Sequence, residues 1–216
     1  MSFPLIKENS VLLFQGDSIT DAGRNRMASG PTSGGDLGFG YARLISDRLL
    51  IDYPELKSRF YNRGISGDRI RDMAMRWDQD AIQIKPDLIS IMIGVNDTWN
   101  YVELGLGSDP EDYLQVFRKI LQDTRRHLSE TRLVLCEPFL LHTGGVTEVW
   151  LDDIRERQEI VRSLAKEHQG VVVPFQSSLD EAANDIPAHK LLNDGVHPTE
   201  QGHRILAECW LRTVLS

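Results

Sequence analysis

The stretch Leu88-Ile89-Ser90-Ile91-Met92-Ile93, closed by Gly94, decides the fold class of this chain. Its side chains form an almost unbroken apolar run and do not alternate with polar ones. A strand that faces solvent on one side alternates apolar and polar residues, whereas a strand covered on both faces does not. The run therefore predicts a central strand of a parallel sheet with helices packed on both faces.

Similar short apolar runs recur along the chain, separated by longer segments of helical period. The expected strands cover residues 11–15, 59–62, 88–93, 133–136 and 171–173. Apolar residues three or four positions apart predict helices over residues 41–52, 70–77, 110–128, 150–165 and 198–214. This alternation is typical of βαβ units, and we expect a single three-layer α/β domain over residues 1–216.

Composition and charge argue against several classes of protein. Hydrophobic residues make up 41% of the chain and charged residues 26%, close to globular averages, so a disordered chain is not expected. The net charge of −8 disfavours nucleic acid and anionic membrane as partners, because both attract basic surfaces. Cys136 and Cys209 lie far apart without zinc-site spacing, and we expect both to be small buried apolar residues.

We expect no targeting or membrane segment. The first ten residues lack the order of basic start, apolar run and small-residue cleavage site that marks a signal peptide. No apolar run approaches the roughly 20 residues that cross a bilayer. These features predict a cytoplasmic protein.

Candidate catalytic residues follow the expected strands, where the ligand crevice of a parallel sheet lies. Ser18 follows the first strand, and its hydroxyl could be a nucleophile or could cap a helix. Gly64 ends the second strand and Asn96 follows the third, and each could be an ordinary turn residue. Together, the Ser18 N–H, a free Gly64 N–H and the Asn96 amide would be three convergent donors of the kind that stabilise a tetrahedral oxyanion.

A serine nucleophile needs a base, and His197 is the best candidate among the six histidines. Asp194 stands three residues before it in a loop that ends at Pro198, so one turn can bring the carboxylate to the imidazole. His203 falls within the last expected helix, where we expect a structural role. The remaining histidines lie at helix ends or in loops without an acid at a telling spacing: His127, His142, His168 and His189.

These motifs carry a family resemblance. Gly16-Asp17-Ser18-Ile19, the Gly64 block, Gly94-Val95-Asn96-Asp97 and Asp194-x-x-His197 resemble, in this order, the sequence blocks of the SGNH superfamily of GDSL-type hydrolases. The resemblance implies a three-layer αβα sandwich with a flavodoxin-like, five-stranded parallel sheet. It implies Ser18 as nucleophile, His197 as base and Asp194 as the acid that orients it. The implied oxyanion donors are Ser18, Gly64 and Asn96.

A closer resemblance is to the bacterial GDSL-type acetylxylan esterases, which are usually intracellular and act on acetylated xylo-oligosaccharides. It rests on residues 16–24, Tyr53-Pro54-Glu55, Gly64-Ile65-Ser66-Gly67, Arg76-Trp77, Lys85-Pro86-Asp87 and residues 90–94. The resemblance implies a small acyl ester or an acetylated oligosaccharide as substrate, with no cofactor and no metal. It is also compatible with a homo-oligomer.

Clues to the substrate are fewer. Trp99 and Tyr101 follow Asn96 on an expected loop, close enough to form a wall of the crevice. Aromatic faces suit sugar rings, although buried packing is an equally good use for Trp99. The loop from Gly23 to Gly40 is polar and glycine-rich and offers no apolar lid for a lipid. The sequence therefore favours a serine esterase that removes acetyl groups from carbohydrate.

Other functions stay open at this point. A lysophospholipase, a thioesterase or a broad-specificity arylesterase would use the same chemistry. A metal pair for phosphoester hydrolysis could be held by Asp17, Asn96, Asp97, Asp194 and His197, but no Asp-x-His follows the first strand. A sugar-binding protein without activity would not need Ser, His and Asp together. Chelation would separate the esterase from the phosphoesterase, and turnover would separate both from the binding protein.

Overall fold

Parallel strands form the centre of the molecule. In the computed structural model, which describes residues 5–107 and 109–216, five strands pair in the order β2-β1-β3-β4-β5, all parallel. The strands are β1 (Val11–Gly16), β2 (Arg59–Asn62), β3 (Leu88–Met92), β4 (Arg132–Cys136) and β5 (Val171–Val173). The α/β class and the central place of the 88–93 stretch are thereby confirmed. Residues 1–4, part of the expected domain, lie outside the described residues.

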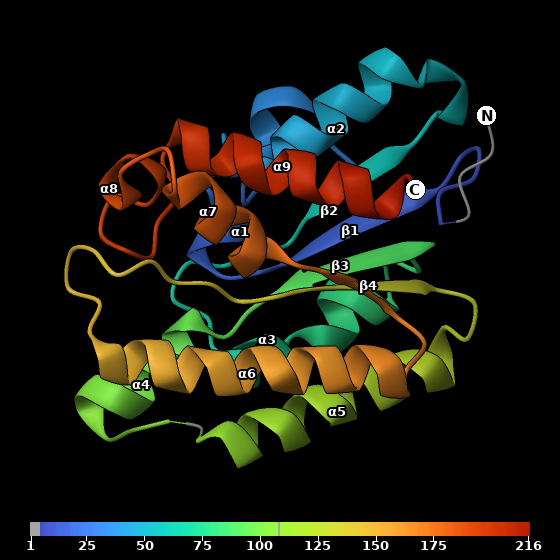
Figure 1. The fold of residues 1–216 in the computed structure, drawn as a ribbon. Helices are drawn as coiled ribbons and strands as arrows, with labels where there is room; N and C mark the ends of the chain where they lie inside the picture. Colours follow the sequence, from blue (N-terminus) through green and yellow to red (C-terminus); the bar gives the residue numbers. More distant parts are fainter. Residues whose placement is uncertain (1–4, 108) are drawn as a thin grey trace.

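Helices cover both faces of this sheet (Figure 1). One face carries α2 (Tyr41–Asp52), α7 (Phe175–Ala183) and α9 (Glu200–Val214). The other carries α3 (Ile70–Met75), α5 (Pro110–His127) and α6 (Glu148–Glu167). The shorter elements are α1 (Ser18–Asp21), α4 (Val95–Leu104), α8 (Ala188–Leu191), the 3-10 turns η1 (Gly34–Leu37) and η2 (Pro54–Leu56), and the π-helical turn η3 (Asp78–Ile82). Within the described part of the chain, no helix combines the length and the apolar character needed to cross a membrane.

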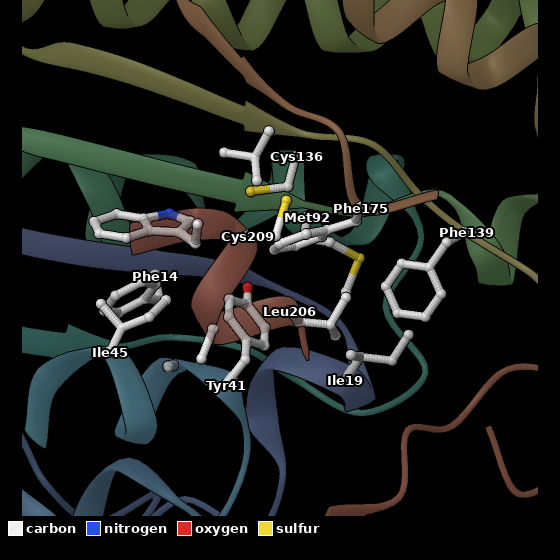
Figure 2. Close-up of a cluster of buried hydrophobic side chains, with 14 of the residues drawn as sticks. Phe14, Ile19, Tyr41, Ile45, Met92, Cys136, Phe139, Phe175, Leu206 and Cys209 are labelled. Atoms are coloured by element: carbon white, nitrogen blue, oxygen red, sulfur yellow. The ribbon is translucent and has the colours of Figure 1, made fainter. Parts of the chain in front are cut away.

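The strand β1, which lies between β2 and β3, packs against both helical layers. All six of its residues are buried. Leu12 and Phe14 belong to the apolar cluster on the α9 side, and Leu13 belongs to the cluster on the α5 side. Figure 2 shows the first of these clusters, in which Phe14 lies with Tyr41 and Leu206 between the sheet and its covering helices. Burial on both faces explains why the strand sequences do not alternate.

Ser90 is the polar residue inside the stretch that decides the fold, and it is fully buried. The indole Nε1 of Trp210 in α9 donates to Ser90 Oγ at 3.0 Å. Ser90 Oγ also lies 3.5 Å from Cys136 Sγ. The hydroxyl is thus satisfied across the layers, as a buried polar group must be. Cys136 and Cys209 are both free and buried, as expected.

The structure differs from the expectation after β3, where the helix α4 takes the place of a loop. Its sequence, with β-branched residues and two asparagines, has weak helix propensity. Tertiary contacts stabilise it instead: Asp97 Oδ2 accepts the Ile70 N–H at 3.0 Å, and Thr98 Oγ1 donates to Asp153 Oδ2 at 2.6 Å. The helices α7 and α8 also occupy a segment for which the sequence pattern indicated none.

The strand order places a topological switch at β1. The chain pairs β1 with β2 on one edge and with β3 on the other. In open parallel sheets the ligand crevice lies beyond the carboxyl ends of the strands at such a point. The segments that follow β1, β2 and β3 therefore converge there, and they carry Ser18, Gly64 and Asn96.

Candidate active site

Ser18 opens the short helix α1 immediately after β1. Asp17, not Ser18, is the N-cap residue, since its Oδ1 accepts the Ile19 N–H at 3.0 Å. A Cβ at Gly16 would lie 2.3 Å from Met92 O and 2.3 Å from Thr20 Oγ1, so the turn requires glycine. Because the cap is supplied by Asp17, the Ser18 hydroxyl is not used for capping and is available for chemistry.

Ser18, His197 and Asp194 form a continuous hydrogen-bonded chain. Ser18 Oγ lies 3.0 Å from His197 Nε2, and His197 Nδ1 lies 2.7 Å from Asp194 Oδ2. With a proton on Nδ1 directed to the carboxylate, Nε2 is left with a lone pair that faces the serine hydroxyl. This is the arrangement of a nucleophile, a general base and an orienting acid.

The loop that carries Asp194 and His197 is closed on itself. Leu192 and Pro198 form an isolated bridge, and the Asn193 N–H donates to His197 O at 2.9 Å. Asp194 Oδ1 accepts the N–H groups of Val196 at 2.9 Å and His197 at 2.7 Å. Partial burial raises the pKa of Asp194, but the hydrogen bonds from His197 and Val196 outweigh it and hold that pKa below its ordinary value. The carboxylate is therefore charged where it meets the imidazole.

Two of the three expected oxyanion donors, Ser18 and Asn96, have an N–H that no described group of the protein accepts. The Ser18 N–H has no partner among the residues that the structure describes. Asn96 Nδ2 donates to Asp68 O at 3.0 Å, which uses one of its two hydrogens. Asn96 also lines the same pocket as His197. Both groups can therefore donate toward a carbonyl oxygen held at Ser18.

The expectation of a free Gly64 N–H is wrong. That N–H donates to Asn62 Oδ1 at 2.9 Å, and Gly64 is buried. A Cβ there would lie 2.4 Å from the Asp21 N, so this glycine is needed for close packing of β2 against α1. Gly67, three residues on, is exposed at φ +89°, and no acceptor for its N–H is found in residues 5–107 or 109–216.

Gly67 also lies beside Asn96, because the carbonyl that Asn96 Nδ2 contacts belongs to the next residue, Asp68. The sequence shows both glycines in one block, Gly64-Ile65-Ser66-Gly67, and contains no signal that separates the packed glycine from the exposed one. The contacts of Asn62 and Asp21 make that distinction.

A pocket of about 270 Å³ lies at Asp194 and His197. Its lining consists of Val95, Asn96, Trp99, Trp150, Asp194, Val196 and His197. Trp99 is 45% exposed and forms part of this wall, on a helix and not on the expected loop. Tyr101, expected beside it, is not among the lining residues. The pocket is small and mostly apolar.

Two ionisable groups near the site are deeply buried. Burial raises the pKa of Asp17 to about 7; the Ile19 N–H opposes the rise, while Asp97 and Asp68 add to it. Asp17 Oδ2 has no partner within the described residues. His203 accepts the Tyr41 N–H on Nδ1 at 3.2 Å, and burial, with a smaller effect of His197, lowers its pKa to about 4. His203 is therefore neutral and structural, as its place in the last helix predicted.

Across the described ranges, no group of three or more His, Cys, Asp or Glu side chains is arranged to hold a metal ion. The acids and the histidine of the hypothetical metal pair are used otherwise. Asp17 caps α1, Asp97 accepts from the Ile70 N–H, and Asp194 Oδ2 lies 2.7 Å from His197 Nδ1. That hydrolysis needs no metal stays a prediction.

Comparison with known proteins gives a consistent result. The family described as GDSL-like lipase/acylhydrolase matches residues 14–205. An acetylxylan esterase of Geobacillus stearothermophilus is 36% identical over 208 residues, which cover 94% of this chain and 93% of that protein.

Solved structures agree over the whole fold. A protein of Parabacteroides merdae described as a GDSL-like lipase superposes with a TM-score of 0.92 at 37% identity, covering 97% of both chains. The acetylxylan esterase Axe2 of Geobacillus stearothermophilus superposes with a TM-score of 0.89 at 34% identity, covering 97% of this chain and 96% of its own. Structures of Axe2 described as catalytic mutants have a serine, an aspartate or a histidine replaced by alanine.

Proposed function

The chain belongs to the GDSL-like lipase/acylhydrolase family and is a carboxylic ester hydrolase, and we propose that it removes O-acetyl groups from carbohydrate through Ser18, His197 and Asp194. The favoured substrates are acetylated xylo-oligosaccharides. The observation that carries the proposal is the hydrogen-bonded chain from Ser18 Oγ through His197 to Asp194, with contacts of 3.0 and 2.7 Å.

In the first half-reaction, Ser18 Oγ attacks the ester carbonyl carbon while His197 Nε2 takes the hydroxyl proton. Collapse of the tetrahedral intermediate breaks the bond to the sugar oxygen, which receives the proton from His197. The product is a sugar hydroxyl and an acetyl ester on Ser18. Asp194 keeps Nδ1 protonated throughout and stabilises the imidazolium that forms.

In the second half-reaction, water replaces the sugar. His197 takes a proton from the water, whose oxygen attacks the acetyl-Ser18 carbonyl, and the Ser18 oxygen then leaves with that proton. Acetate is released and the enzyme returns to its starting state. Apart from substrate and water, the two halves as written use only groups of the chain.

Negative charge develops on the carbonyl oxygen in both halves. We assign its stabilisation to the Ser18 N–H, the Asn96 amide and the Gly67 N–H, with Gly67 in place of Gly64. Support for this choice comes from the hydrogen bonds: the Gly64 N–H is used by Asn62, whereas the Gly67 N–H has no partner in the described part of the chain. Donors fixed in advance cost no reorganisation when the charge appears.

Two further observations support the assignment. In the Axe2 structures described as catalytic mutants, the replaced aspartate precedes the replaced histidine by three residues, as Asp194 precedes His197. The pocket of about 270 Å³ beside His197 is small and has the half-exposed Trp99 in its wall. The small volume suits an acetyl group, and the half-exposed indole of Trp99 suits stacking with a sugar ring.

A turnover comparison tests this function. Acetylated xylo-oligosaccharide, acetylated chitin fragments, a lysophospholipid and an acyl-thioester are offered to the protein and to its Ser18→Ala variant, with and without EDTA. We expect the xylo-oligosaccharide to be deacetylated fastest, equally well in EDTA, and only when Ser18 is present. Faster turnover of the lysophospholipid or thioester would replace the carbohydrate assignment, and loss of activity in EDTA would overturn the metal-free mechanism.

Three broader expectations accompany this proposal. One domain over residues 1–216, a cytoplasmic location and a homo-oligomer each stay predictions, as does the lack of nucleic-acid binding. Limited proteolysis, cell fractionation and light scattering after gel filtration test the first three. An electrophoretic shift assay tests the last.

A further inference from the structure

A second and larger pocket, of about 640 Å³, is lined in part by Tyr61 of β2 and by Arg63 and Ile65, which follow that strand. Its lining includes Arg24, Arg26 and Arg63, together with Ile65, Gln79 and one carboxylate, that of Asp80. None of these residues takes part in the proposed hydrolysis. Three arginines around one pocket are notable in a chain whose net charge is −8.

Arg24 is the buried member of this group, with 9% of its surface exposed. Its Nε donates to Gly64 O at 2.7 Å. Neither Nη1 nor Nη2 has a hydrogen-bond partner or an ion pair in residues 5–107 and 109–216. The side chain is buried along its length, whereas neither Nη nitrogen is among the fully buried unpartnered atoms of the described residues, so both can reach the pocket. The two Nη nitrogens form a fork that lacks its acceptor.

The other two arginines of the pocket each lie beside a carboxylate of the chain. Arg26 pairs with Asp21, and Arg63 lies 3.7 Å from Asp80. Asp21 Oδ2 also accepts the Ser66 N–H. Burial lowers the pKa of Arg24; Asp21 opposes this, and the nearby cations of Arg63 and Arg26 add to it. An anion bound at the two Nη nitrogens would therefore stabilise the charged form of Arg24.

The pocket lies close to the nucleophile. The Arg24 N–H donates to Asp21 O, and Asp21 ends the single helical turn that Ser18 begins. Ile65, which lines the pocket, stands two residues before Gly67. Arg24 thus contacts the first residue of the 64–67 block, whose last residue, Gly67, is assigned to the oxyanion, and this suits a substituent on the same or the neighbouring sugar.

We propose that this pocket binds a carboxylate carried by the oligosaccharide substrate, a uronic acid residue beside the acetylated sugar, with both carboxylate oxygens on the Arg24 Nη fork. Bidentate pairing of this kind matches the planar geometry of both groups. The amide of Gln79, exposed at the rim, is available for the sugar hydroxyls. The inference rests on the proposed function, because it names the class of carbohydrate that the esterase prefers.

The kinetic test compares two acetylated xylo-oligosaccharides that differ only by a glucuronic acid substituent. The protein is expected to favour the acidic one in kcat/KM, and added NaCl is expected to reduce this preference. Arg24→Gln should lower the acidic-to-neutral ratio by about tenfold, mainly through KM, the scale of a lost charged hydrogen-bond pair. Arg43→Gln, at a half-exposed arginine on α2 paired with Asp47, is the control and should keep the ratio. An equal ratio in the protein and in Arg24→Gln would overturn the proposal.

A binding test separates this inference from the esterase assignment. Glucuronate, inorganic phosphate and glucose are titrated into the protein and followed by NMR, without any turnover. We expect glucuronate to bind and glucose not to. Ser29→Glu, which places a negative charge on the pocket lining, should abolish glucuronate binding, whereas Ser29→Gln should keep more of it.

Ser29→Glu also covers the case in which Arg24→Gln does not fold, because it leaves Arg24 and its bond to Gly64 in place. Glucuronate binding without deacetylation of carbohydrate would support the pocket and refute the proposed function. Deacetylation of carbohydrate without glucuronate binding would support the proposed function and refute the pocket proposal. Binding of phosphate but not of glucuronate would overturn the assignment to a carboxylate.

Discussion

Asp194 holds His197 at two points: its Oδ1 accepts the backbone N–H at 2.7 Å, and its Oδ2 accepts the ring Nδ1–H at 2.7 Å. The same carboxylate therefore fixes the position of the residue and the tautomer of its ring. Orientation and tautomer are what an orienting acid contributes to a serine nucleophile.

Asp194→Asn should lower kcat on the order of 10³- to 10⁴-fold while the protein stays folded. The asparagine carbonyl can still accept the backbone N–H groups, but its amide cannot accept a proton from Nδ1, so the ring is held in the wrong tautomer. Steady-state kinetics on p-nitrophenyl acetate measure the effect. Asp185→Asn, an exposed change in the segment before the loop, is the control. A loss of less than tenfold would remove Asp194 from the proposed triad.

Asn96→Ala should reduce kcat on the order of 10²-fold with a smaller effect on KM, the usual cost of one oxyanion donor. The reason is that the amide binds charge that exists only in the transition state. Asn100→Ala removes an amide one turn later on α4, where it donates to Asn96 O at 2.8 Å, and should change kcat only a few-fold. An effect of Asn96→Ala confined to KM would make Asn96 a contact of the bound substrate instead.

Gly64→Ala should destabilise the protein by about 1–3 kcal/mol, the range for an overpacked site. Its Cβ would lie 2.4 Å from the Asp21 N, so α1 and Ser18 with it would have to move. Gly145→Ala meets no atom within 4 Å and should have little effect on stability. Urea unfolding of both variants measures the difference. Equal stability of the two would contradict the packing role that we give to Gly64.

Asp17→Asn should change how stability depends on pH. The pKa of Asp17 is raised by burial from 3.8 to about 7 in the folded protein, so its contribution to stability is fully present below pH 3.8 and is lost as the pH rises through 7. A shift of this size corresponds to about 4 kcal/mol. In Asp17→Asn this loss should be missing, whereas the exposed Asp185→Asn should keep it. Urea unfolding at several pH values gives the comparison, and parallel pH profiles for the protein and Asp17→Asn would refute a buried neutral carboxyl.

Acyl length should separate a deacetylase from a lipid hydrolase. Each methylene beyond acetate must find room in a pocket of about 270 Å³ bounded by Trp99 and Trp150, so kcat/KM should fall from acetate to decanoate. A lipid site would instead gain about 0.8 kcal/mol for each buried methylene, and the rate would rise. A series of p-nitrophenyl esters measures the slope. A rising slope would favour the lysophospholipase alternative.

Local patterns determined much of this protein in advance. The unbroken run around Ser90 requires burial on both faces, and a parallel sheet is the structure that provides it. Asp194 and His197 stand within a turn of four residues, so their spacing allowed the contact, and the motifs at the other strand ends indicated that it is used. The position of Ser18 at the carboxyl end of the first strand was likewise predicted from the apolar run of residues 11–15 and the Gly16 turn that follows it.

The tertiary structure alone decided features that depend on partners distant in the sequence. The 64–67 block shows two glycines, and only Asn62 and the packing of Asp21 determine that the Gly64 N–H is used and the Gly67 N–H is not. The helix α4 formed against its local propensity because Asp97 contacts Ile70.

The same holds for Arg24, whose Nε contacts a carbonyl 40 residues away while its Nη fork lacks any acceptor in the described ranges. The spacing of apolar residues, the helix caps and the turns depend on residues that are close in the sequence, so they can be predicted from it. Whether a buried donor has an acceptor depends on which segments the fold brings together, and the chain must be folded before that is determined.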